Sequence, residues 1–435
     1  MSQESHEGGV PELGERMYAL CEELFPICRS ITGDGVRETL RIVGRHIPLE
    51  ISEVPTGTPV FDWTVPKEWN IRDAYIRDPR GRKVVDFQAL NLHVVNYSVP
   101  VRTRLPLEAL KAHLFSLPDR PQLVPYRTSY YKETWGFCLA HERLLALEDG
   151  EYEVVVDSTL EPGSLSYGEC VLPGDSTEEV LISAHVCHPS LANDNLSGIA
   201  LATYLARALA GRPHRYTYRF IFAPGTIGSI TWLARNEDVV PRIRHGLVVS
   251  CVGDGGGPTY KRSRQGSAEI DRAVAHVLAH CGRAGVKVED FSPYGYDERQ
   301  YCSPGFDLPV GLFERSKYGT FPEYHTSGDN LDFIQVEALN DSYRWISQVI
   351  SILEDNACYL NTHPKCEPQL GKRGLYNAVG GSNDSASIQM AMLWVLNLSD
   401  GGNSLLDIAE RAGIPFETVH RAASLLADAQ LLTAC

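Results

Sequence analysis

Apolar and polar positions follow different periods along the chain, and the changes of period divide it into segments. From residue 179 onward, short apolar runs typical of buried strands alternate with longer stretches of helical period. This alternation predicts an α/β fold with a mostly parallel sheet and helices on both faces. The strands are expected at 180–184, 218–223, 246–252, 286–290 and 308–313, and the helices at 197–210, 227–235, 268–281 and 334–352.

The remaining segments have a different pattern. Residues 57–175 contain prolines, tryptophans and short alternating runs, which are typical of a β-rich module. The end of the chain has one apolar helix followed by two helices around a turn at Gly413, the pattern of a helix-turn-helix. We therefore expect an α/β domain built from residues 1–56 and 176–368, an inserted β-rich domain at 57–175, and a winged helix-turn-helix domain at 369–435.

The composition narrows the class of protein. A chain of 435 residues with 43% hydrophobic and 22% charged residues is typical of a globular enzyme of two or three domains. We find no apolar run long enough to span a bilayer, and the N-terminal residues are polar and acidic, unlike a signal peptide. We therefore expect a cytoplasmic protein without a membrane partner. The net charge of −15 argues against nucleic acid as the main partner.

The most informative stretch follows the first predicted strand of the α/β domain. This strand ends at His185, Asp194 follows nine residues later, and the small pair Ser197-Gly198 then opens a helix. A strand end can aim an imidazole, and the following loop can supply a carboxylate beside it. Zinc accepts this mixture of nitrogen and oxygen ligands.

Two further residues extend this candidate site. Asp254 lies among glycines just after the strand expected at 246–252, and His325 lies in a loop before a long helix. Since ligands bind at the carboxyl edge of such sheets, we expect both residues to join His185 and Asp194. This set would hold one zinc ion, or two that share Asp194. We interpret His188 as a loop or core histidine rather than a further ligand.

Segment 180–355 resembles the zinc aminopeptidase-like fold of bacterial leucine aminopeptidases, glutamate carboxypeptidases and glutaminyl cyclases. His185 matches the family's first ligand, and Asp194, three residues before Ser197-Gly198, matches the second. The resemblance implies a cis peptide bond after Asp194. It also implies ligand roles for Asp254 and for His325, which Asp329 follows. The whole chain is more similar still to a bacterial subfamily with an inserted β domain and a C-terminal winged helix, associated with polysaccharide or secondary-metabolite pathways.

The chain departs from the family at the catalytic base. The aminopeptidases have two glutamates after the strand equivalent to 218–223, one as general base and one as metal ligand. This chain has Gly225 and Thr226 there, and Cys187 where the family has an aspartate that supports the ligand histidine. A hydrolase needs a proton acceptor, so the base must come from elsewhere.

Several other residues are candidates for catalysis and substrate binding. The carboxylates nearest in sequence to the predicted site are Asp297, Glu298 and Glu323, and we consider all three as catalytic residues. A small basic cluster after Asp254 and a glycine-rich turn near the N-terminus have donors for a substrate carboxylate or phosphate. The substrate-binding candidates are Tyr260, Arg262 and Arg29.

The last 51 residues are acidic, with five acidic side chains against the two arginines Arg411 and Arg421. A helix that reads DNA normally has several basic residues. We expect this tail to serve packing or homo-oligomerisation and not DNA recognition.

These observations favour a zinc-dependent hydrolase that cleaves an amide or peptide-like bond in a small metabolite or peptide. Three alternatives stay open. The first is a single-zinc cyclase or acyl-transfer enzyme that uses the metal only as a Lewis acid. The second is a non-catalytic metal-binding scaffold. The third, a transcriptional regulator, is disfavoured by the acidic tail.

Overall fold

A computed structural model describes residues 10–375 and 385–435 of the chain. It divides into two compact units, Met1–Gly266 with Lys287–Tyr343, and Ser267–Val286 with Arg344–Cys435. In the part of the chain that is described, no helix combines the length and the apolar character needed to cross a membrane.

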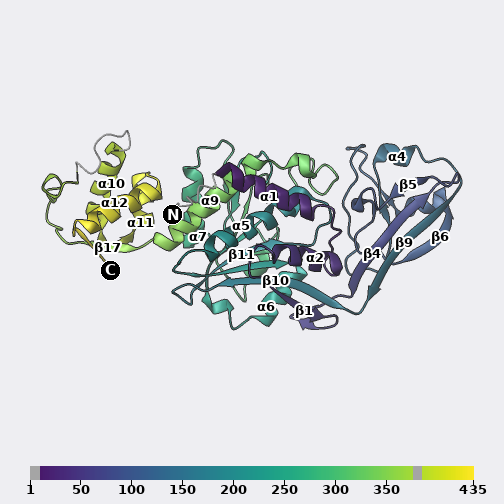
Figure 1. Cartoon of the computed structure of the whole chain (residues 1–435), viewed down its shortest axis with the longest axis horizontal. Helices are drawn as coiled ribbons and strands as arrows, with labels where there is room; N and C mark the ends of the chain where they lie inside the picture. Colours follow the sequence, from purple (N-terminus) through teal and green to yellow (C-terminus); the bar gives the residue numbers. More distant parts are fainter. Residues whose placement is uncertain (1–9, 376–384) are drawn as a thin grey trace, which may run out of the picture. The chain divides into compact units, whose positions relative to one another are not determined.

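The first unit is built around an eight-stranded sheet (Figure 1). Its centre is parallel, as expected, because β11 pairs in parallel with β12 and β13, and β13 with β16. Three strands that the sequence did not predict, β1, β10 and β14, pair antiparallel toward the two edges. In spatial order the strands are β1 (Glu50–Pro55), β10 (Ser164–Leu172), β12 (Thr217–Ala223), β11 (Glu179–His185), β13 (Ile243–Val249), β16 (Val310–Glu314), β14 (Thr259–Lys261) and β15 (Lys287–Glu289).

Helices cover both faces of this sheet. The connection from β11 to β12 and the connection from β12 to β13 run in opposite directions along the sheet, so right-handed crossovers place their helices on opposite faces. Figure 1 shows α5 on one face together with α1 and α2, and α6 on the other. The helices of the first unit outside the insert are α1 (Val10–Leu24), α2 (Asp34–Val43), η3 (Ala192–Ser197), α5 (Gly198–Ala210), α6 (Ile227–Arg235), η4 (Val240–Arg242), α8 (Glu298–Tyr301) and η5 (Leu331–Phe333).

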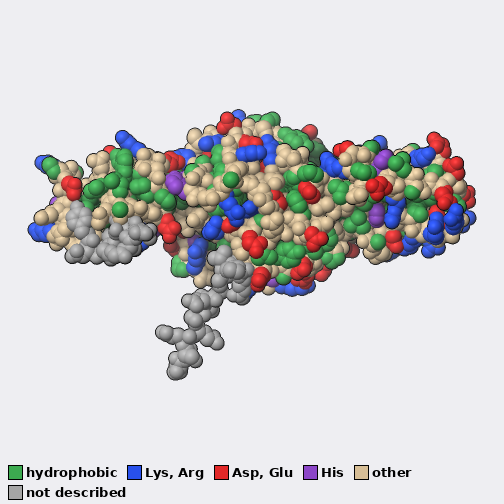
Figure 2. All heavy atoms as spheres, turned by 90° about the horizontal axis from the view of Figure 1, so that it is seen from above, with side chains coloured by type: hydrophobic (Ala, Val, Ile, Leu, Met, Phe, Trp, Pro, Cys, Tyr) green, Lys and Arg blue, Asp and Glu red, His purple; other side chains and the backbone are tan. Residues whose placement is uncertain are grey.

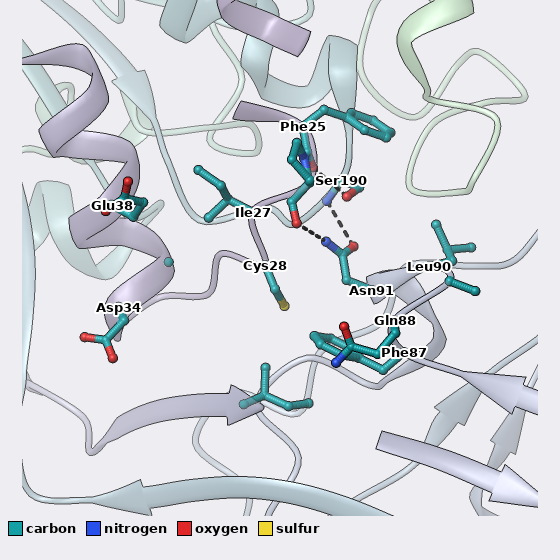
Figure 3. A pocket seen from close by; sticks show the side chains of 14 residues that line it. Phe25, Ile27, Cys28, Asp34, Glu38, Phe87, Gln88, Leu90, Asn91 and Ser190 are labelled. Carbon is teal, nitrogen blue, oxygen red and sulfur yellow. Dashed lines mark hydrogen bonds between the residues drawn. The ribbon is translucent and has the colours of Figure 1, made fainter. Parts of the chain in front are cut away.

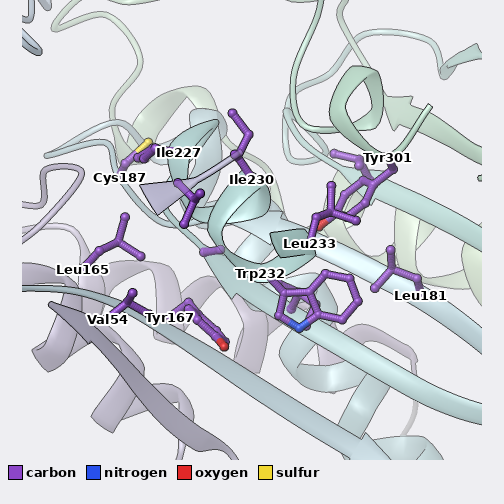
Figure 4. Packing of buried hydrophobic residues seen from close by; sticks show 14 of the residues in the cluster. Val54, Leu165, Tyr167, Leu181, Cys187, Ile227, Ile230, Trp232, Leu233 and Tyr301 are labelled. Carbon is purple, nitrogen blue, oxygen red and sulfur yellow. The ribbon is translucent and has the colours of Figure 1, made fainter. Parts of the chain in front are cut away.

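A cluster of buried side chains fixes α6 to the sheet (Figure 4). Trp232 and Tyr301 are fully buried and their rings meet edge to face at 6.4 Å, beside Leu181 of β11. The indole of Trp232 donates a hydrogen bond to Glu169 of β10 at 2.9 Å. Packing in this core fixes the positions of the segments that follow β11 and β12.

The insert has a four-stranded antiparallel sheet with its own buried core. Strand β10, although it lies within the expected range 57–175, belongs to the central sheet, because its backbone pairs with β1 and β12. The elements of the insert are β2 (Pro59–Val60), β3 (Trp63–Thr64), β4 (Glu68–Arg77), β5 (Lys83–Asp86), η1 (Asn91–His93), β6 (Val101–Pro106), α3 (Leu107–Leu110), η2 (Lys111–His113), β7 (Leu114–Phe115), β8 (Phe137–Cys138), α4 (His141–Leu145) and β9 (Glu151–Glu161).

The second unit contains the expected helix-turn-helix. Helix α11 ends at Gly413, whose φ of 64° suits glycine, and α12 follows. The helix expected at 268–281 forms as α7 but lies in this unit, where Arg272 pairs with Asp407 and Glu410. The elements here are α7 (Glu269–Ala279), β17 (Cys358–Asn361), η6 (Gly371–Arg373), α10 (Ser385–Leu398), β18 (Asp400–Ser404), α11 (Leu405–Ala412), α12 (Phe416–Asp428) and β19 (Leu432–Ala434), while α9 (Val336–Asp355) continues from the first unit.

The first residue of α5 allows this helix to approach β13 closely. A Cβ atom at Gly198 would lie 2.2 Å from Asn195 Oδ1 and 2.6 Å from the Val249 carbonyl oxygen. We predict that Gly198→Ala destabilises the protein by about 1–3 kcal/mol through overpacking. Gly211→Ala, just after the same helix, is the matched control because its Cβ has open space. Urea denaturation measures both; equal stabilities of the two variants would contradict this account.

Candidate metal centre

The site begins at the end of β11. His185 is the last residue of this strand, and Asp194 lies in η3, where the loop turns into α5. The two side chains meet, with 2.8 Å between His185 Nε2 and Asp194 Oδ1, and Asp194 is fully buried. The peptide bond after Asp194 is cis, which confirms what the resemblance implied.

Two more histidines approach the same carboxylate. His325 Nε2 lies 3.0 Å from Asp194 Oδ2, so the structure brings together three of the four expected ligands. His188, which sequence analysis interpreted as a loop or core residue, lies with Nδ1 3.2 Å from His185 Nε2 and 3.4 Å from Asp194 Oδ1. The donor atoms of His185, His188 and Asp194 are within 4.8 Å of one another. The His-x-x-His spacing at a strand end was the available signal for His188.

The protonation states suit a metal. Burial alone would raise the pKa of Asp194, but its contacts with His188, His185 and His325 outweigh burial and hold this pKa well below its usual value. Burial lowers the pKa of His325, against the opposing effect of Asp194. The low pKa of Asp194 supplies the ionised carboxylate that a metal needs, and zinc accepts a mixture of imidazole and carboxylate ligands, so this donor set fits zinc.

Asp254 does not join this group. Its Oδ2 accepts from Asn193 Nδ2 at 2.9 Å, and its Oδ1 accepts from the Ser316 hydroxyl at 2.6 Å. Asp329 acts on the same loop, because its carboxylate accepts the backbone N–H groups of Asn193 and Asp194 at 2.5 and 3.0 Å. Asp254, through the side chain of Asn193, and Asp329, through two backbone N–H groups, hold the loop that contains Asp194 in place.

The space of the missing family glutamate lies beside Asp297. A Cβ atom built on Gly225 would be 3.3 Å from His185 Cβ and 3.5 Å from Asp297 Oδ1. Asp297 is buried, and burial raises its pKa to about 7 despite a 3.0 Å hydrogen bond donated by the Ser229 hydroxyl. The carboxylate of Asp297 therefore comes close to Gly225, the position where the resemblance to the zinc aminopeptidases implies a glutamate base.

The other two catalytic candidates have different surroundings. Glu298 is fully buried and forms an ion pair with Lys261, whose ammonium also donates to the Tyr294 carbonyl at 2.8 Å. Glu323 is part-buried, two residues before His325, and its carbonyl accepts from Thr326 N at 3.0 Å. Adjacent residues Asp297 and Glu298 thus have different roles, one near the histidines and one in a charge pair.

The three substrate-binding candidates are engaged in contacts within the protein. Tyr260 is fully buried in β14, and Arg262 follows it, with a guanidinium N–H bonded to the Gly266 carbonyl at 2.8 Å. Arg29 is also fully buried, and its Nε donates to the His188 carbonyl at 2.7 Å. Arg29 therefore holds the backbone of the loop between His185 and Asp194, which we call the metal loop.

Aromatic residues line the metal donors. Tyr296 stacks on His185 with 4.8 Å between ring centroids, and Tyr324 stacks on His325 at 4.0 Å. Tyr126 meets both His188 and His325 edge to face at 5.1 Å. Sequence analysis missed Tyr126, because it lies in the insert and has no motif.

The insert is joined to the His325 loop by its backbone. Tyr126 N donates to the His325 carbonyl at 2.8 Å, and Ser327 N donates to the Val124 carbonyl at 2.8 Å. Pro125 and Thr326 form an isolated antiparallel bridge. The insert therefore supplies one wall of the site as well as a separate sheet.

A cavity of about 500 Å³ lies behind the metal loop (Figure 3). Ser190 donates from its hydroxyl to the Phe25 carbonyl at 2.6 Å, and its backbone N–H donates to Asn91 Oδ1 at 3.2 Å. The lining of the cavity mixes apolar residues such as Ile27 and Phe87 with the polar residues Asp34, Glu38 and Gln88. These contacts tie the back of the metal loop to α1 and the insert.

Two family models match the chain. The family described as a domain of unknown function, DUF4910, matches residues 18–356, and a winged helix-turn-helix family matches residues 357–434. The second match confirms the expected C-terminal winged helix.

The chain is also similar to known proteins. A protein from Clostridium acetobutylicum, provisionally described as a polysaccharide biosynthesis protein with an aminopeptidase-like domain, is 55% identical over 421 residues, 97% of this chain and 96% of that protein. A crystal structure from the same organism, provisionally described as a peptidase, has 53% identity and a TM-score of 0.93, covering 98% of this chain and 97% of that one. A zinc aminopeptidase from Bacillus subtilis has 12% identity and a TM-score of 0.57, covering 78% and 94%. The aminopeptidase-like fold is thereby confirmed.

The donor geometry generates a test of the metal ligands. We predict that His188→Ala loses most of its zinc after loading and desalting, as His185→Ala does, because both remove an imidazole from the group around Asp194. Asp254→Asn should keep its zinc, since that carboxylate bonds to Asn193 and Ser316 instead. Metal analysis gives the result. Full zinc in His188→Ala together with loss in Asp254→Asn would show that the assignment is wrong.

Proposed function

The chain belongs to the family described as DUF4910, and from this membership and the site we propose that it is a single-zinc hydrolase of an amide or peptide-like bond. The observation that carries this proposal is the placement of Asp297, a buried carboxylate whose pKa burial raises to about 7, beside Gly225, which also adjoins His185 of the metal group. The solved zinc aminopeptidase of the same fold supports a peptide-like bond as the class of substrate.

The proposed ligands are His185, His188, Asp194 and His325. When bound, zinc would supply a Lewis acid that polarises a carbonyl and makes water more acidic. The Asp194 oxygens lie at 2.8 and 3.0 Å from the Nε2 atoms of His185 and His325, so these donor atoms face one another as ligands of one metal would, and Asp329 holds Asp194 through its backbone. We propose that Asp254 serves the loop and is not a ligand.

The proposed role of Asp297 is proton transfer. Its ionised form would accept a proton from the attacking water, and its protonated form would then donate to the leaving amine. A pKa of about 7 makes both forms available near neutral pH. The Ser229 hydroxyl stabilises the ionised form by donating to Oδ1. Ser229 is therefore a positioning residue that tunes the base.

The rival proposals differ in their dependence on this carboxylate. A cyclase or acyl-transfer enzyme that uses zinc only as a Lewis acid, or a non-catalytic scaffold, would keep the metal ligands without needing Asp297. The description of the Clostridium acetobutylicum relative adds polysaccharide biosynthesis as a setting for the substrate.

The winged helix raises the question of a nucleic-acid partner. Winged helices occur in many DNA-binding proteins, so this match does not fit the expectation that nucleic acid is no partner. On the other hand, the exposed residues of α12 include Glu417 and Asp428 beside the single Arg421. Lys and Arg side chains are interspersed with Asp and Glu on the face drawn in Figure 2. We propose packing or homo-oligomerisation as the role of this unit.

The base assignment is tested by kinetics and metal content together. We predict that Asp297→Asn lowers turnover of an acyl amide at least about 100-fold while zinc content stays unchanged. Wild-type kcat/KM should rise with pH to a plateau above about pH 7, because Asp297 must be ionised. Ser229→Ala should move this rise to higher pH, since it removes a hydrogen bond that lowers the pKa of Asp297.

Glu323→Gln is the control for this test, because Glu323 is the remaining catalytic candidate and lies two residues before His325. Full activity of Asp297→Asn with a large loss in Glu323→Gln would assign the base to Glu323. Full activity of both variants would favour the Lewis-acid rival. Gly225→Glu, which introduces the glutamate found in the zinc aminopeptidases, should crowd Asp297 and change activity in either case.

The charge of the second unit generates a separate prediction. We expect no sequence-specific complex with duplex DNA at physiological salt, because acidic groups outnumber basic groups among the exposed residues of α12. Electrophoretic mobility shift with a randomised duplex library measures this. A nanomolar complex with any enriched sequence would overturn the packing role.

A further inference from the structure

Two exposed aromatic side chains from different segments meet near the metal group. Trp63 of β3 is 45% exposed and Tyr131 of the insert is 53% exposed. Their ring centroids are 5.6 Å apart and the rings are tilted by 53°. Single exposed aromatic residues need no explanation, but two that converge are a feature of binding surfaces.

The backbone holds this region in a costly conformation. Tyr131 has a φ of 64°, and Phe61, two residues before Trp63, has a φ of 56°. A bulky side chain in the left-handed region costs about 1–2 kcal/mol. Phe61 and Tyr131 are 52% and 53% exposed, so burial of these side chains does not offset the cost of the backbone conformation. Strain that packing does not repay is typical of functional positions.

A row of tyrosines, joined by contacts from Tyr126 to Tyr130 and by sequence from Tyr130 to Tyr131, leads from the metal donors to this pair. Tyr131 follows Tyr130, whose phenol lies 2.9 Å from the Tyr126 phenol, and the Tyr126 ring contacts His188 and His325. His325 is 35% exposed, so the group is open to solvent at this histidine. The chain from Tyr131 through Tyr130 and Tyr126 thus leads to the two histidines His188 and His325.

The surfaces along this row are neutral and amphipathic. The phenols of Tyr126 and Tyr130 bond to each other, and those of Tyr296 and Tyr324 are 3.4 Å apart. Each ring presents an apolar face and a hydroxyl at its edge. A pyranose ring has the complementary surface, with C–H groups on its faces and hydroxyl groups around its edge.

We propose that Trp63 and Tyr131 form a stacking platform for a sugar ring, and that the substrate is an acylamino sugar whose amide bond lies at the metal group. This inference rests on the proposed amide hydrolysis and names its substrate class. The platform contacts the faces of the sugar ring. The platform residues bind substrate and take no part in proton transfer.

The test measures binding, so that it is independent of turnover. The zinc-loaded full chain is titrated with N,N′-diacetylchitobiose, an acetamido disaccharide, and separately with alanyl-alanine amide, by isothermal calorimetry. We expect the disaccharide to bind the wild type, and Trp63→Ala and Tyr131→Ala to weaken it at least about tenfold. Tyr131→Phe should bind nearly as well as the wild type, because it keeps the ring.

Leu145→Ala is the matched control, since Leu145 is 73% exposed on α4 and has no place in the platform. It should leave the affinity unchanged. Absence of disaccharide binding, equal affinities of all variants, or a platform effect confined to the dipeptide amide would each overturn the proposal. Loss of activity in Asp297→Asn bears on the hydrolase alone, so the two proposals fail separately.

Discussion

The site depends on one buried carboxylate. Asp194 contacts His185 through one oxygen and His325 through the other, and His188 lies beside the first. A buried carboxylate is costly unless it is paired. Asp329 supports it by accepting its backbone N–H, and Gly198 lets α5 pack against β13 immediately afterwards. The central sheet, the metal loop and the His325 loop are all required to surround this one group.

The elements that the sequence predicted correctly have local signals. The strands β11, β12, β13 and β16 are apolar runs, and His185 and Asp194 occupy positions fixed by a strand end and a Ser-Gly pair. Their placement follows from short-range rules of sheet geometry. His325 lies more than a hundred residues further along the chain, and it was predicted from its loop at the expected edge of the sheet and from the resemblance.

What the sequence did not predict depends on long-range packing. The His-x-x-His spacing of His185 and His188 was a signal in the sequence, but this spacing alone does not separate a ligand from a loop histidine, and the fold turns His188 toward Asp194. Asp297 and Glu298 are neighbours in the chain, yet Lys261 pairs with one and Ser229 bonds to the other. Asp254 followed a strand as a ligand would, but Asn193 and Ser316 use its oxygens.

The central claim is that His185, His188, Asp194 and His325 form a single metal site of imidazole and carboxylate donors. X-ray absorption at the zinc edge of the zinc-loaded protein tests this most directly. The account predicts nitrogen and oxygen neighbours at about 2.0–2.2 Å with the scattering pattern of three imidazoles. Sulfur at about 2.3 Å, as from Cys187, or a second metal at about 3.5–4 Å, would contradict this prediction.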